Sequence, residues 1–166
     1  MRFNARFADL VGDEAVRDAP PGDLPALFEA AVAGGWTADD RGAWLLRHFR
    51  ETYHGSPDSF GDLTGYEAAV NGRAIPDLDL AVPGPARAAA LARRGVAFAR
   101  AALRRLDAEH PGHPPAAAYV SVSEVDMDDE ITYAGNITFV TTHEGEPPYL
   151  GELDGAGDAV VTISSP

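Results

Sequence analysis

The segment at residues 110–115, with the sequence HPGHPP, constrains the fold most, because neither a helix nor a strand can cross it. Proline lacks a backbone N–H and fixes φ, so three prolines within six residues interrupt both kinds of hydrogen-bonded ladder. Apolar residues recur with helical spacing before this segment and form strand-like runs after it. We therefore expect a mainly helical part at residues 1–109, a linker at 110–115 and a mainly strand part at 116–166.

The length of 166 residues is typical of one compact domain, and we expect residues 1–166 to form one. The chain contains no Cys, which excludes a disulfide framework and thiolate chemistry. No run approaches the roughly 20 apolar residues that a membrane-spanning helix needs. No apolar segment follows the Arg residues of the first ten positions, so no secretory signal is predicted and we expect a cytoplasmic protein.

Helical periodicity dominates the first part of the chain. The longest amphipathic stretch places Ala and Leu on one face and six Arg on the other. Gly95 falls on its apolar face and predicts a close crossing with another helix. Thr64 with Glu67 has the spacing of a capping box, and Thr37 with Asp40 resembles a weaker one. The expected helices span residues 4–11, 24–34, 37–53, 64–71 and 86–109.

The pattern after residue 115 is typical of strands, because β-branched and aromatic residues form short runs between turn residues. Gly135 and Asn136 interrupt the second run and predict a bulge or a tight hairpin turn. Residues 76–83 form either a strand or a connector, and no other strand is expected before residue 75 except at the N-terminus. The expected strands, joined as an antiparallel meander, span residues 119–125, 131–142, 149–153 and 159–164. These elements predict an α+β fold: N-terminal helices followed by a three- or four-stranded antiparallel sheet, with the long Ala/Arg-rich helix packed on the sheet.

Charge divides the chain at the same place as the secondary-structure pattern. Residues 1–106 contain all 13 Arg and 14 acidic residues, whereas residues 107–166 contain 12 acidic residues and no Arg or Lys. The net charge of −13 repels phosphates and argues against nucleic acid as the main partner. The Arg face of the long helix is expected to meet the acidic residues of the last part, in the same chain or in a second copy.

The acidic residues of the last part are expected to form a rim at one end of the sheet. In a meander, the turns at residues 126–130 and 151–158 fall at the same end, and like charges placed close together favour a cation or a basic partner. Residues 126–130 do not match an EF-hand loop, because Ile131 and Ile137 stand where that loop has Gly and Glu. We therefore expect an acidic turn. The expected partner-binding residues of this rim are Asp126, Asp128, Asp129, Glu130, Asp154 and Asp158.

A metal site is the second candidate. His48, Glu51 and His54 recur at every third residue, and two imidazoles with a carboxylate form a set that binds divalent metals. On a helix, however, steps of three spread side chains across a broad surface, here the solvated side opposite the apolar stripe. A solvated helix face is therefore the preferred interpretation, and no cofactor is expected beyond a divalent cation held by these residues or by the acidic turns.

Three hypotheses of function follow from these features. The first is a small acidic, non-catalytic protein that binds a basic protein partner, as an inhibitor, immunity protein or antitoxin does, because complementary charge speeds encounter and fixes the register of binding. The second is a divalent-metal-dependent enzyme or metal-binding module. The third is a homo-oligomeric regulatory or structural protein, in which the Arg helix of one copy meets the acidic sheet of another.

Overall fold

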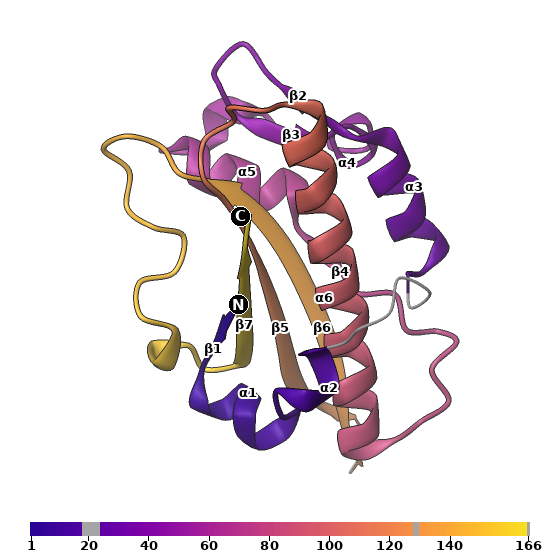
Figure 1. Ribbon diagram of the computed structural model, residues 1–166. Helices are drawn as coiled ribbons and strands as arrows, with labels where there is room; N and C mark the ends of the chain where they lie inside the picture. Colours follow the sequence, from indigo (N-terminus) through magenta and orange to yellow (C-terminus); the bar gives the residue numbers. More distant parts are fainter. Residues whose placement is uncertain (18–23, 128–129, 166) are drawn as a thin grey trace.

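The structure, a computed structural model, describes residues 1–17, 24–127 and 130–165 (Figure 1). The described helices are α1 Ala5–Leu10, α2 Glu14–Arg17, α3 Ala26–Gly34, α4 Arg47–Glu51, α5 Leu63–Asn71 and α6 Gly84–Glu109, with short 3-10 turns η2 Pro57–Ser59 and η3 Leu153–Gly155. The strands are β1 Arg2–Phe3, β2 Trp36–Ala38, β3 Trp44–Leu46, β4 Arg73–Ala74, β5 Ala116–Met127, β6 Glu130–Thr141 and β7 Ala159–Ser164. Within the described ranges, no helix is both long and apolar enough to cross a membrane.

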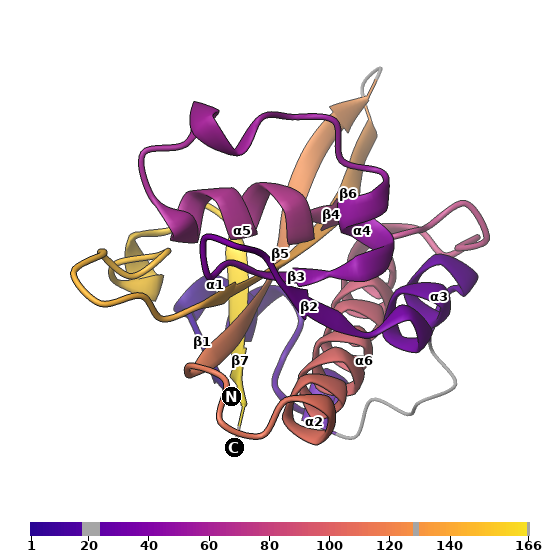
Figure 2. The same cartoon turned by 90° about the horizontal axis from the view of Figure 1, so that it is seen from above.

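The predicted α+β class is confirmed, as is the long helix on the sheet. The main sheet is antiparallel with the strand order β1-β7-β5-β6-β4, so it has five strands rather than three or four, and β2 pairs with β3 in a separate sheet. α6 and α5 lie on opposite faces of the main sheet (Figure 2). Strand alternation explains this arrangement: Ile137 and Phe139 of β6 join the core with α6, whereas the intervening Thr138 donates a hydrogen bond to the Ala68 carbonyl of α5.

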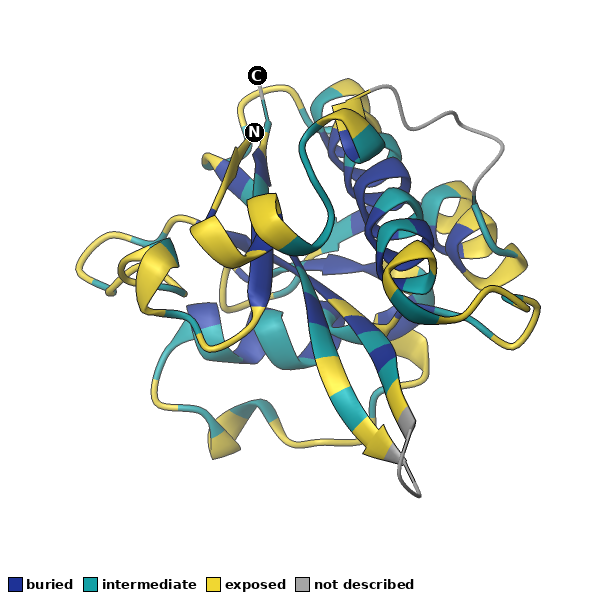
Figure 3. Cartoon of the chain, turned by 90° about the horizontal axis from the view of Figure 1, so that it is seen from below, coloured by how far each residue is buried: buried dark blue, intermediate teal, exposed yellow. Residues whose placement is uncertain are grey.

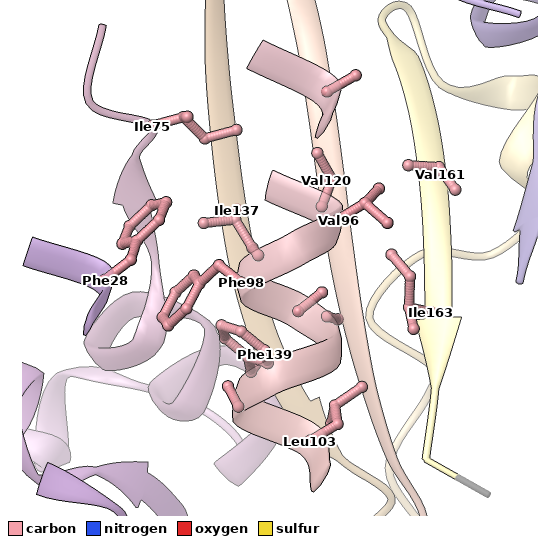
Figure 4. Packing of buried hydrophobic residues seen from close by; sticks show 14 of the residues in the cluster. Phe28, Ile75, Val96, Phe98, Leu103, Val120, Ile137, Phe139, Val161 and Ile163 are labelled. Carbon is pink, nitrogen blue, oxygen red and sulfur yellow. The ribbon is translucent and has the colours of Figure 1, made fainter. Parts of the chain in front are cut away.

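Two glycines allow α6 to approach the sheet closely. A Cβ atom on Gly95 would lie 2.5 Å from Cγ1 of Val120, and one on Gly135 would lie 2.9 Å from Cδ1 of Ile75. The predicted close crossing at Gly95 is therefore made with strand β5 and not with another helix. The predicted bulge or turn at Gly135 is wrong, because β6 continues through it and its missing side chain leaves room for Ile75 and Leu91. Figure 4 shows the resulting apolar layer, which includes Val96, Phe98, Leu103, Val120, Ile137, Phe139, Val161 and Ile163.

The single helix expected over residues 37–53 is wrong. Residues 36–46 form the β2–β3 hairpin, and the helix α4 begins only at Arg47. The hairpin turn explains the difference: the Asp39 carboxylate accepts hydrogen bonds from the N–H groups of Arg41 and Ala43, and Gly42 has φ +93°. Thr37 accordingly lies in a strand and does not cap a helix.

The strand connections also differ from the predicted meander. β7 pairs with β5 on the side opposite β6, and residues 149–153 form no strand between them. β2, β3 and β4 all precede residue 75, where no strand was expected beyond the N-terminus. Residues 76–83 are a connector, and its Asp77 and Asp79 pair with Arg87 and Arg94 of α6. These two arginines therefore pair with carboxylates in the first half of the chain, and Arg87 also donates a hydrogen bond to the Tyr133 carbonyl oxygen of β6.

The close approach at Gly95 generates the first prediction. We expect Gly95→Val to lower the free energy of unfolding by about 1–3 kcal/mol, because the added methyl groups would overlap Val120 in a packed core. Ala101→Val on the same helix is the matched control, since Ala101 is only half-buried and the change should cost less than about 0.7 kcal/mol of helix propensity. Urea unfolding of the two variants measures the difference, and equal losses would contradict this account of the packing.

Candidate functional site

A cleft of about 700 Å³ opens at the end of the sheet where β5 begins and β6 and β7 end. Its walls come from the linker after α6 and from the segment that follows β6, with the start of α5 at one side. Pro111, Pro115, Pro147 and Pro148 supply rigid apolar surface, and no Arg lines it among the described residues. The cleft therefore combines apolar walls with the polar side chains described next.

A buried carboxylate lies beneath one wall of the cleft. Glu67 of α5 is fully buried, and its oxygens accept hydrogen bonds from the N–H groups of Trp44 at 2.6 Å and Thr141 at 2.5 Å, and from the Thr141 hydroxyl at 2.8 Å. Burial raises the pKa of Glu67 above its ordinary value, although these hydrogen bonds and His143 act in the opposite direction. Glu67 thereby provides hydrogen-bond acceptors for backbone N–H groups of β3 and β6 at the positions where strand pairing stops.

Glu67 also orients a histidine of the cleft. His143 Nε2 lies 3.1 Å from Glu67 Oε1 and 3.2 Å from the Thr141 hydroxyl oxygen. The imidazole lines the cleft with only 11% of its side chain exposed, and its Nδ1 has no hydrogen-bond partner among the residues that the structure describes. The ring is therefore held through Nε2, on the side that faces Glu67 and Thr141.

The loop after β6 is fastened to the start of α5. One Glu146 oxygen accepts a hydrogen bond from Leu63 N at 2.9 Å. The other oxygen accepts hydrogen bonds from Thr64 N at 2.9 Å and from the Thr64 hydroxyl at 2.7 Å. These N–H groups have no partner within the helix, and a carboxylate at a helix N-terminus is favoured by the helix dipole. Burial acts to raise the pKa of Glu146, but the hydrogen bonds from Thr64 and Leu63 outweigh it and lower the pKa below its ordinary value.

The opposite wall holds a second imidazole–carboxylate pair. His113 Nε2 lies 2.8 Å from Asp107 Oδ1, and its Nδ1 lies 2.6 Å from the Pro114 carbonyl oxygen. Asp107 remains 31% exposed, so its carboxylate is open to the cleft. Tyr119 and Tyr149 meet edge to face, with ring centroids 5.1 Å apart, and separate this cleft from a neighbouring one of about 390 Å³.

The predicted rim residues occupy two places. Asp126 is exposed on the outer part of β5, in a two-stranded ribbon that extends beyond β7 (Figure 3). Asp158 is exposed just before β7, near Ser123. The exposed Asp154 carboxylate accepts a hydrogen bond from Ala5 N at 3.2 Å. The other three predicted residues, Asp128, Asp129 and the side chain of Glu130, lie outside the described residues. A single cluster of these acids stays a prediction.

The predicted metal residues do not share one helix. α4 ends at Glu51, so His48 lies within it and His54 lies beyond it. In the described part of the chain, no group of three or more His, Asp or Glu side chains is arranged to hold a metal ion. The expected solvated face agrees with the exposure of Glu51 and His54, whereas His48 is half-buried.

The residues that shape the cleft are not evident from local patterns in the sequence. Glu67 was assigned to a capping box with Thr64, but α5 begins at Leu63 after the Asp62 N-cap, so both residues lie inside the helix. Residues 143–146 form a turn, and nothing in the local pattern links His143 to a carboxylate 76 residues earlier. The apolar stripe of α5 was the available signal, since Glu67 lies among its buried positions.

Comparisons of the chain with protein-family models, with curated proteins and with solved structures found no match. The assignment of function therefore depends on the chemistry of the cleft and of the surface around it.

The anchored loop generates the second prediction. Glu146→Gln should lower the free energy of unfolding by about 1 kcal/mol at pH 7, the usual contribution of a helix N-terminal acceptor. Because the native pKa of Glu146 lies below its unfolded value of 4.5, the contribution is complete above that value and is lost as the pH falls through the native pKa. Urea unfolding at several pH values measures this loss.

The matched control is Glu144→Gln, an exposed carboxylate two residues away in the same turn. Its effect on stability should stay within about 0.5 kcal/mol. If the Glu146 variant differs from the wild type equally at neutral and at acidic pH, the carboxylate does not hold the helix in the way described.

Proposed function

We propose that the protein is a non-catalytic binding protein that recognises a basic protein partner through the acidic surface of its last sixty residues. One observation supports this above the others: among the described residues of this part, six acidic side chains are exposed, and the part contains no Arg or Lys to neutralise them. These side chains are Glu124, Asp126, Glu144, Glu152, Asp154 and Asp158.

Four of the six lie on one segment, residues 142–158, which connects β6 to β7 and supplies one wall of the cleft. Glu124 and Asp126 follow on the outer part of β5. A surface spread over several elements suits a protein partner better than a small molecule, which binds within one concave site. None of the six lines the cleft itself: Glu144 lies between His143 and Glu146, which do, whereas Glu124 and Asp126 lie toward the other end of β5.

The charge of this surface determines how such a partner would bind. Exposed carboxylates act over about 10 Å at 0.1 M salt and raise the rate at which an oppositely charged protein associates. They contribute less to the final affinity, because each exposed ion pair is worth about 0–1 kcal/mol. We therefore expect fast, salt-sensitive association.

The third prediction tests the location of this surface with nona-arginine as a basic probe. Asp126→Asn, Glu152→Gln and Asp158→Asn together should weaken binding about tenfold at low salt, because three exposed charges of this surface are lost. Isothermal titration calorimetry at about 50 mM and about 300 mM NaCl should show most of this difference at the lower concentration.

The matched control is the triple variant Glu29→Gln, Asp40→Asn and Glu51→Gln, which removes the same charge from exposed positions in the first half of the chain. It should weaken binding by less than about threefold. Equal weakening by both triple variants would show attraction by net charge alone, and an absence of binding to the wild type would also reject the proposal.

A further inference from the structure

We propose that the cleft is the subsite for an arginine side chain of the basic partner. This inference rests on the proposed function, because it names the part of the partner that enters the acidic surface. The cleft, with a volume of about 700 Å³, is large enough for one long side chain, and the segment that holds four of the exposed acids forms one of its walls.

The charges lining the cleft favour a cation. Asp107 and Glu146 both line it, and Asp107 uses Oδ1 for His113, which leaves Oδ2 without a hydrogen-bond partner among the described residues. Glu146 Oε1 accepts only one hydrogen bond there, from Leu63, although a carboxylate oxygen can accept two. A guanidinium group has five N–H donors in a planar fork, which suit such unfilled carboxylate acceptors.

The walls favour arginine over lysine. Tyr119 and Tyr149 present aromatic surface, and Pro147 and Pro148 present flat apolar surface beside it. A guanidinium group stacks on such surfaces and is weakly hydrated, whereas an ammonium group holds its water strongly. The mixture of carboxylates and ring faces is therefore better matched to a guanidinium than to a compact charge.

No Arg or Lys of the described residues lines this site. Of the described residues that line the cleft, His113 and His143 are the basic ones, and the Nε2 atom of each already faces a carboxylate. The two carboxylates therefore retain acceptor capacity that an incoming donor can use.

The site is also fixed before any ligand binds. Glu146 fastens one wall to α5, the pair His113 and Asp107 fastens the other to the end of α6, and Thr142 N donates to the Pro115 carbonyl at 2.8 Å between them. A site whose side chains are already held loses little conformational freedom on binding.

The experiment uses three tripeptides, acetyl-Gly-X-Gly-amide, in which X is arginine, lysine or citrulline, the neutral analogue of arginine. Two-dimensional NMR of the isotope-labelled full chain reports both affinity and location. We expect the arginine peptide to shift signals of residues 111–119 and 140–149, and to bind at least about tenfold more tightly than the citrulline peptide and about threefold more tightly than the lysine peptide.

Two variants test the walls separately. Asp107→Asn and Tyr149→Ala should each weaken binding of the arginine peptide at least about fivefold. Glu51→Gln, an exposed acid on α4, should leave its affinity unchanged. Asp107→Asn removes the hydrogen-bond partner of His113 and can lower stability. Tyr149 is 40% exposed, so Tyr149→Ala should fold normally and keeps the test valid in that case.

The outcomes separate this inference from the proposed function. If nona-arginine binds as proposed but the arginine tripeptide shifts signals elsewhere, or binds no better than citrulline, the arginine subsite is wrong and the proposed function stands. If neither probe binds, both are wrong. Arginine selectivity that maps to the cleft and falls in both variants supports the subsite.

Discussion

Two buried polar side chains on the inner face of α5 hold the structure around the cleft together. Glu67 and Asn71 are four residues apart, so they share one helix face. Glu67 binds the N–H groups of Trp44 and Thr141, and Asn71 accepts from Leu46 N while donating to carbonyl oxygens of β3 and β6. Buried backbone groups must be paired, and here the pairing joins the small sheet, the helix and the end of β6.

This arrangement gives the cleft its form. Because Glu67 fixes the end of β6, His143 leaves the strand in one orientation and the loop that follows returns to α5 through Glu146. α6 packs on the other face of the same sheet at Gly95, so the strands that line the cleft have packed elements on both faces. Residues 142–158 are thus attached through Glu146 to a helix that packs on this sheet, an arrangement that suits a surface that meets a partner.

Long patterns in the sequence were sufficient to predict α6, β5 and β6, because each extends over many residues. The short strand β7 was predicted from its run of β-branched residues. Short patterns were not: the apolar run at residues 44–46 fits a helix or a strand, and the turn around Asp39 decides between them. Glu67 satisfies the local spacing of a capping box, while its real partners Trp44 and Thr141 lie 23 and 74 residues away. The unequal distribution of charge is visible in the sequence, whereas the cleft is formed by residues that only the tertiary structure brings together.

Hydrogen–deuterium exchange of the wild-type chain, with and without nona-arginine, tests most directly whether the cleft and the segments that line it bind a basic partner. The account predicts slower exchange in residues 110–119 and 142–158 when the probe is present, because binding covers these backbone amides and restrains the loops that carry them. The helices α3 and α4 should exchange at the same rate in both samples. Protection confined to those helices, or spread evenly along the chain, would contradict the account.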